Sequence, residues 1–171
     1  MRTLLAVGCP ILAASIDAGA QIGPANAMPS DFNFIFQYGH GRILDTSKGT
    51  FTRDAAVPKY SLTVDFKLMV IEMEDIYRGL ISIDFWNYSK YPQLFTVPPE
   101  RPIVGVVPGG TDYLLRVTSS GSVKQLRWHD SILVYYQPAQ ELRELFGKIR
   151  STIESKPEYK NLPPSQVKYV D

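Results

Sequence analysis

The segment that most constrains the fold is residues 73–88, which read MEDIYRGLISIDFWNY. Its large apolar side chains recur at steps of three and four residues, the spacing of one face of an α-helix. The acidic residues near its start lie mostly off that face, where water can solvate them. They also fall in the first turns, where the helix dipole favours negative charge. Gly79 weakens the helix by about 1 kcal/mol relative to alanine, so we expect another element to pack closely there. The apolar face comprises Met73, Ile76, Tyr77, Leu80 and Ile83.

Three aromatic residues, Phe85, Trp86 and Tyr88, follow this helix within four positions. A cluster of this kind can bury on the order of several hundred Å² and is typical of a plug at one end of a hydrophobic core. An exposed patch of rings that recognises a partner is the alternative.

The N-terminus has the pattern of a secretory signal peptide. Arg2 precedes an apolar run at residues 4–16, and small residues suited to cleavage occur at 18–20 and 25–27. Asp17 ends the run before the roughly 20 residues that a membrane span needs, so we expect no stable span in the mature chain. Cleavage after residue 27 would also remove Cys9, the single cysteine, whose lipidation is the alternative. A cysteine-free exported chain suits a bacterial periplasm or cell surface.

Alternating patterns predict a β-meander in the first half of the mature chain. Aromatic residues occupy every second position of residues 32–38, the period of a half-buried strand. Glycine-containing turns separate this strand from two more at 42–46 and 50–54. A fourth strand is expected at 60–68, and it leads into the first helix without a good N-cap residue.

The second half of the chain predicts a loop, a hairpin and a helix. Residues 89–110 lose periodicity and contain five prolines, which indicates a long loop, with 103–107 a candidate edge strand. Residues 111–118 and 123–129 alternate around a Ser-Ser-Gly-Ser turn and predict a hairpin; residues 132–136 are a candidate continuation. A second amphipathic helix starts near Pro138 and ends near Pro157; its apolar positions are Leu142, Leu145, Phe146, Ile149 and Ile153.

These elements predict a single α+β domain at residues 28–164, between a signal peptide (1–27) and a loosely held tail (165–171). We expect two layers: an antiparallel sheet of about six strands, built from a meander and a hairpin, with both helices on one face. The length of 171 residues suits one domain with a proper core. The net charge of +1, with mixed signs along the chain, predicts no nucleic-acid partner.

The sequence contains no recognisable catalytic or metal-binding motif. Its two histidines are His40, at a predicted turn, and His129, in the tripeptide Trp-His-Asp, whereas zinc sites use three or four ligands. Neither the G-x-S-x-G elbow of hydrolases nor a calcium-binding loop occurs. We therefore expect a non-enzymatic protein without a cofactor. A small hydrolase that uses Asp84 or His129 is an alternative.

Aromatic residues give the main functional signal. The chain has ten tyrosines, and a small two-layer domain cannot bury all of its rings. Such rings are enriched at binding hot spots and carbohydrate platforms, so we expect a binding domain for a protein or glycan. Aromatic residues that complete the rim of the core are the structural alternative. The candidate contact residues are Trp86, Tyr88, Tyr91, Trp128 and His129.

Three segments of the sequence carry a family resemblance. The first contains YGHG (38–41) and GTFTRD (49–54), the second contains IDFWNY (83–88), and the third joins WHD (128–130) to ESKPEYKNLP (154–163). Together they resemble a family of small exported bacterial proteins, many of them lipoproteins, with no assigned activity. The resemblance spans nearly all of the mature chain and implies no catalytic residues. It departs from the family's pattern at residues 68–71, where a polar helix start is expected.

In element order alone, the chain is also similar to emfourin-type proteinaceous inhibitors of bacterial metalloproteases. Those inhibitors share a plan of strand, helix, aromatic corner, hairpin and helix. This similarity makes inhibition of a bacterial protease an alternative function. The loop at 89–110 or the aromatic corner would then contact the enzyme.

Overall fold

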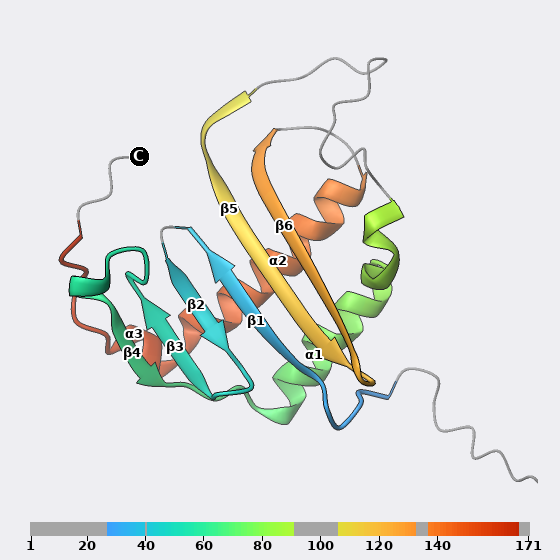
Figure 1. The fold of residues 1–171 in the computed structure, drawn as a ribbon, viewed down its shortest axis with the longest axis horizontal. Helices are drawn as coiled ribbons and strands as arrows, with labels where there is room; N and C mark the ends of the chain where they lie inside the picture. Colours follow the sequence, from blue (N-terminus) through green and yellow to red (C-terminus); the bar gives the residue numbers. More distant parts are fainter. Residues whose placement is uncertain (1–26, 40, 91–105, 133–136, 168–171) are drawn as a thin grey trace, which may run out of the picture.

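The computed structural model describes residues 27–39, 41–90, 106–132 and 137–167. The chain folds into two layers, an antiparallel sheet of six strands and a layer of helices behind it (Figure 1). The strand order is β4-β3-β2-β1-β5-β6, so the meander is extended by a hairpin on the side of β1. The predicted α+β class, with a sheet of six strands covered by helices on one face, is confirmed.

The first four strands form the meander, and alternation decides which side chains they bury. In β1 the rings of Phe34, Phe36 and Tyr38 are buried while the residues between them are half-exposed, because successive side chains of a strand face opposite sides. The fourth strand is shorter than predicted at both ends, and residues 58–60 before it form a 3-10 turn that begins with a proline. The bounds are β1 (Asn33–Tyr38), β2 (Arg42–Asp45), β3 (Thr50–Arg53), η1 (Pro58–Tyr60) and β4 (Leu62–Asp65).

The hairpin consists of β5 (Val106–Ser119) and β6 (Ser122–Ile132) and is longer than the sequence pattern indicates. Its turn residues, Ser120 and Gly121, both have positive φ, as a two-residue type I′ turn requires. The carboxylate of Asp31 accepts hydrogen bonds from both turn N–H groups, at 2.8 and 2.7 Å. A bulge between Val106 and Thr111 marks the far end of the pairing.

The helices are α1 (Val70–Ser82), η2 (Phe85–Lys90), α2 (Gln137–Ser155) and α3 (Pro157–Lys160). The start of α1 lacks a polar N-cap side chain, and a residue inside the helix satisfies the backbone N–H of the N-cap residue instead. Glu72 accepts a hydrogen bond from the backbone N–H of Met69 at 2.6 Å, which is half of a capping box. Lys156 also reaches Glu72, at 2.6 Å, so the first turn of α1 is tied to the end of α2.

The close approach expected at Gly79 is confirmed. A Cβ atom built on Gly79 would lie 2.8 Å from Cδ1 of Leu145 on α2, well inside the 3.5–4.0 Å or so at which carbon atoms pack. The glycine therefore marks the place where α1 crosses α2. Glycine has a lower helix propensity than alanine, but the absence of a Cβ atom lets the two helices pack closely.

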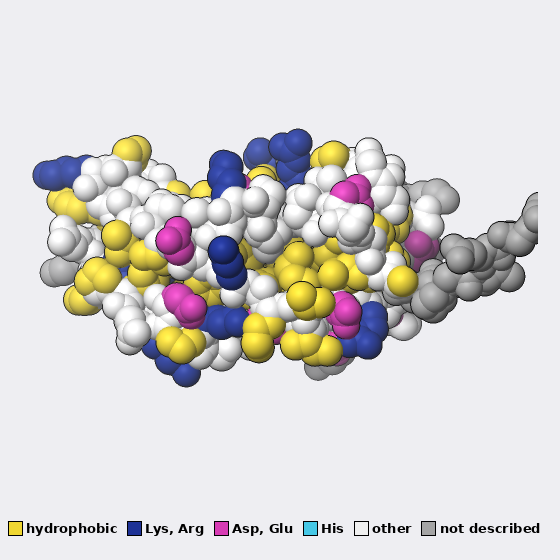
Figure 2. Space-filling model, turned by 90° about the horizontal axis from the view of Figure 1, so that it is seen from below, with side chains coloured by type: hydrophobic (Ala, Val, Ile, Leu, Met, Phe, Trp, Pro, Cys, Tyr) yellow, Lys and Arg dark blue, Asp and Glu magenta, His cyan; other side chains and the backbone are white. Residues whose placement is uncertain are grey.

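The hydrophobic core lies between the sheet and the helices. Figure 2 views the molecule from below and shows hydrophobic side chains as a band across its middle, where the two layers meet. Fully buried residues come from both halves of the chain: Phe34, Phe36 and Leu44 of the meander, Leu115 and Val117 of the hairpin, and Leu80, Leu142 and Ile149 of the helices. One contiguous core of this kind is typical of a single domain.

Candidate binding cleft on the open face of the sheet

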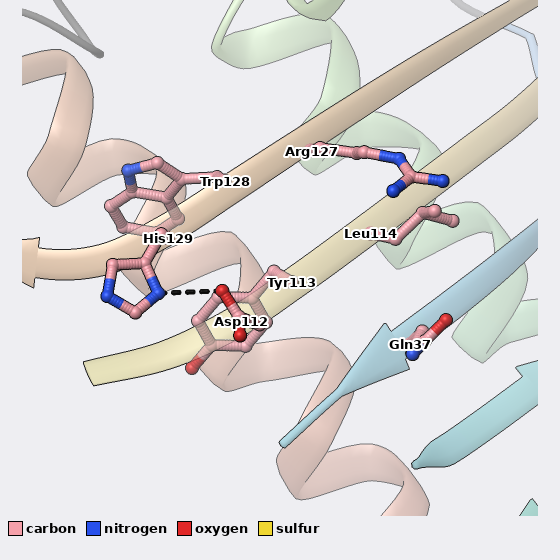
Figure 3. Close-up of a pocket in the computed structure, with 7 residues that line it drawn as sticks. All are labelled: Gln37, Asp112, Tyr113, Leu114, Arg127, Trp128 and His129. Carbon is pink, nitrogen blue, oxygen red and sulfur yellow. Dashed lines mark hydrogen bonds and ion pairs between the residues drawn. The ribbon is translucent and has the colours of Figure 1, made fainter. Parts of the chain in front are cut away.

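Among the described residues, one face of the sheet carries no helix (Figure 1). A cleft of about 450 Å³ lies on this face over β1, β5 and β6, and Figure 3 shows the residues that line it. Polar side chains dominate its lining, and they come from segments that are far apart in the sequence. The lining residues are Gln37, Asp112, Tyr113, Leu114, Arg127, Trp128 and His129.

The register of the three strands places these side chains in two rows. Gln37 pairs with Leu114, and Leu114 pairs with Arg127, so an amide, an aliphatic group and a guanidinium form one row across the sheet. Asp112 pairs with His129 in the next row. Residues two positions apart on a strand are roughly 7 Å apart, so the two rows border an open space of the size of a small ligand group. Figure 3 shows both rows along the strands.

Asp112 and His129 form the polar corner of the cleft. Nδ1 of His129 lies 2.6 Å from Oδ1 of Asp112, with side-chain exposures of 55% and 80% respectively. A contact this exposed adds little to the free energy of unfolding, and its main effect is to orient the imidazole. Because Nδ1 faces Asp112, Nε2 is the ring nitrogen that a ligand can reach.

The guanidinium of Arg127 makes no ion pair with a carboxylate among the residues that the structure describes. The carboxylate of Asp112 is already engaged by His129. Arg116, on the same face of β5, likewise has no acidic partner among the residues that the structure describes. A guanidinium binds carboxylate or phosphate oxygens through two parallel N–H groups. This end of the open face is therefore suited to an anionic group.

An aromatic cluster supports the cleft from the core side of the sheet. The rings of Tyr113 and Trp128 are stacked 5.7 Å apart, and both pack against Phe146 of α2, at 4.8 and 5.9 Å. Burial, followed by the nearby charge of Asp130, raises the pKa of Tyr113, so its phenol is protonated at neutral pH. The strands beneath the cleft are thus fixed by rigid packing.

Trp128 is a core residue, which corrects the expectation of an exposed binding ring. Only 5% of it is exposed. The guanidinium of Arg143 lies 5.5 Å from its ring and also makes a bidentate contact with Asp130 at 2.7–3.0 Å. Trp128 and Asp130 therefore fasten β6 to α2 on the core side. His129, between them, points to the open face.

The other predicted contact residues do not join the cleft. Trp86 is partly buried and packs edge-on against the fully buried Phe85 at 5.6 Å. Its backbone carbonyl also accepts a hydrogen bond from Lys124. The side chain of Tyr88 and the whole of Tyr91 lie outside the described residues.

Asp84, one of the two residues of the hydrolase alternative, holds a turn. It has a φ of +51° directly after α1. Its carboxylate accepts hydrogen bonds at 2.7 Å from the side-chain amide of Asn87, and its backbone carbonyl accepts from the N–H of Asn87 at 2.8 Å. This arrangement starts η2 and gives the carboxylate a structural role.

Sequence reasoning identified His129 but missed Asp112 and Arg127. The signal was present in the hairpin, because a two-residue turn fixes the register of both strands. Counting outward from Ser119 and Ser122 in equal steps places Asp112 opposite His129 and Arg127 opposite Leu114, as observed. Gln37 had no such signal, since β1 joins β5 through a long-range contact.

Several residues that carried the family resemblance have structural roles. A Cβ at Gly41, where φ is +96°, would lie 2.6 Å from the backbone nitrogen of Ala56. The buried carboxylate of Asp54 accepts a hydrogen bond from Ser165 at 2.9 Å, which ties the start of the predicted tail to the meander. Glu154 accepts a hydrogen bond from Arg150 at 2.9 Å. The family assignment itself stays a prediction.

Within the described ranges, no group of three or more His, Cys, Asp or Glu residues is placed to hold a metal ion. Of the helices in those ranges, none combines the length and apolarity needed to cross a membrane. Comparison of the chain with protein-family models, with curated proteins and with solved structures finds no match.

Proposed function

We propose that the protein is an exported, non-enzymatic binding domain that holds an anionic group of its ligand in the cleft on the open face of the sheet. The observation that carries this proposal is the guanidinium of Arg127, which has no acidic partner among the described residues and stands beside an oriented imidazole. We propose export because residues 1–27 have the pattern of a signal peptide.

The other lining residues define what else the ligand should contain. Leu114 offers an aliphatic surface between Gln37 and Arg127, and the amide of Gln37 can both donate and accept hydrogen bonds. A ligand with a carboxylate, a short apolar portion and a hydrogen-bonding group would use all three. Acidic proteins and carboxylated glycans both meet this description.

Hydrolysis with His129 as a general base is the second candidate, because Asp112 orients its imidazole as an acid orients the base of a triad. Among the described residues, the lining contains no serine, threonine or cysteine to act as nucleophile, so this mechanism would need an activated water. The inhibitor alternative falls largely on residues 91–105, which lie outside the described residues. The cleft geometry therefore favours binding.

Calorimetric titration of the mature protein at low ionic strength tests the proposal. The probes are oligogalacturonate and a glutamate-rich peptide, with maltooligosaccharide as the neutral control. We expect a carboxylated probe to bind, Arg127→Gln to weaken that binding about threefold or more, and added salt to weaken it as well. Lys59→Gln is the matched control, because Lys59 is an exposed cation beside β4, at the opposite edge of the sheet.

Two results would contradict the proposal. One is that neither carboxylated probe binds, and the other is that Arg127→Gln binds as tightly as the native protein. Mass spectrometry of the probes after incubation covers the second candidate. Cleavage that is lost in His129→Gln would establish hydrolysis in place of simple binding.

A further inference from the structure

The two edges of the sheet differ in a way that distinguishes a docking edge from a protected one. β4 has four residues and follows a proline-containing turn, whereas β6 has eleven residues and ends the sheet on the other side. A short edge strand offers few free backbone groups, and a long one is a template for another strand. The edge of β6 is therefore the one that another extended chain could extend.

The type I′ turn determines which backbone groups of β6 are free. Ser119 and Ser122 close this turn as a hydrogen-bonded pair, and hydrogen-bonded and non-hydrogen-bonded pairs then alternate along an antiparallel ladder. Even-numbered residues of β6 thus direct their N–H and C=O groups at β5, and odd-numbered residues direct theirs outward. Among the described residues, no backbone hydrogen bond reaches the outward set, which is Val123, Gln125, Arg127 and His129.

The same four residues also point their side chains to the open face. In β6 the alternate residues Leu126 and Trp128 are buried in the core, so their odd-numbered neighbours lie on the other face. Arg127 and His129 line the cleft. The free edge and the cleft are therefore parts of one continuous surface.

We propose that β6 pairs with an extended acidic polypeptide segment, which adds a seventh strand and presents alternate carboxylates to Arg127. This inference rests on the proposed binding function and names its ligand class. Backbone pairing at a sheet edge supplies affinity, and alternate side chains supply specificity. Arg116, one strand further in, also has no acidic partner in the described part of the chain. The charge of the open face therefore selects acidic side chains on the added strand.

A second copy of the chain suits this edge less well. Two β6 strands paired with each other would bring the Arg127 side chains of both copies onto one open face. Juxtaposed like charges disfavour association. An acidic segment instead supplies carboxylates that Arg127 and Arg116 can bind.

Nuclear magnetic resonance of the amide groups gives a direct test. The probe is an acetylated and amidated peptide of alternating glutamate and threonine, with an alternating lysine and threonine peptide as the charge control. We expect the acidic peptide to slow hydrogen exchange at the outward amides of Gln125 and Arg127. The amide of Leu126, already paired with β5, serves as the internal reference and should change little.

Methylated peptides separate strand addition from simple charge attraction. On an added strand only every second amide faces β6, so N-methylation of one alternate set should abolish binding while methylation of the other set is tolerated. Arg127→Gln should weaken binding of the unmethylated peptide about threefold. Equal binding of both methylated sets would overturn the proposal, since the backbone would then have no role.

The remaining outcomes distinguish this inference from the function on which it rests. Arg127-dependent binding of oligogalacturonate without binding of the peptide would overturn the inference and leave the binding function standing. Failure of every carboxylated probe would overturn both. Protection of the outward amides in the protein alone, with concentration-dependent sedimentation, would assign the edge to a second copy and overturn the acidic segment.

Discussion

Replacing Gly79 by alanine should destabilise the protein, although alanine is the better helix former. Gly79 lies inside α1, where the change to alanine adds about 1 kcal/mol of helix propensity. The new Cβ, however, would sit 2.8 Å from Cδ1 of Leu145. Leu145 is 5% exposed, so a shift of Cδ1 away from the new Cβ gives up part of its packing in the core.

The expected magnitude follows from these two opposing effects. Overpacking a core by one methyl group costs about 1–3 kcal/mol, which exceeds the gain in propensity. We expect a net loss of about 1 kcal/mol in the free energy of unfolding. Gly147→Ala in α2 is the matched control, because a Cβ there has no neighbour within 4 Å, and it should stabilise by about 0.5–1 kcal/mol.

Urea unfolding followed by circular dichroism measures both variants under the same conditions. The two free energies of unfolding should differ by about 2 kcal/mol, with opposite signs relative to the native protein. Leu145→Ala removes the obstructing atom, so in that background Gly79→Ala should lose its penalty. If both glycine variants are stabilised to the same extent, the close crossing of α1 and α2 is refuted.

Two further predictions concern the core and the hairpin turn. Phe146 is 1% exposed and packs on Tyr113 and Trp128. Phe146→Ala should therefore lower the free energy of unfolding in urea by about 3–5 kcal/mol, and Phe146→Leu should lower it by less than half of that. Equal losses in the two variants would contradict this packing. Hydrogen bonds from the N–H groups of Gly121 and then Ser120 lower the pKa of Asp31 in the folded protein. The ionised carboxylate therefore stabilises the fold at pH values above the pKa of the unfolded chain, about 3.9. This stabilisation is lost as pH falls through the pKa of the folded protein. The stability difference between native protein and Asp31→Asn should therefore be constant from neutral pH to about pH 4 and shrink below it, and a difference that grows on acidification would contradict this.

Local sequence patterns were sufficient to predict which side chains are buried wherever one face of an element lies in the core and the other faces solvent. The alternation of residues 32–38 placed Phe34, Phe36 and Tyr38 on the core face, and the structure buries all three. The three-and-four spacing of residues 142–153 likewise placed the buried face of α2. In both cases the period of the backbone maps directly onto exposure.

Interpretation of single residues by type was less successful. Trp128 was a candidate binding ring because tryptophan is common at interfaces. It lies two positions after Leu126 on the same strand, so both side chains face the core, and both are buried. Asp84 was a candidate acid, and it holds a turn through Asn87 instead. Residue type states what a side chain can do, whereas its position in the pattern decides which side of the sheet it faces.

The sequence by itself determined the main strands and helices, the buried faces of β1 and α2 and the register of the hairpin, because these depend on contacts between residues close in the chain. The tertiary structure alone decided that β1 pairs with β5, and this pairing brings Gln37 beside Leu114 and completes the cleft. It also decided that β6 ends the sheet. Such long-range pairings are set by the packing of the whole core, and no short stretch of sequence encodes them.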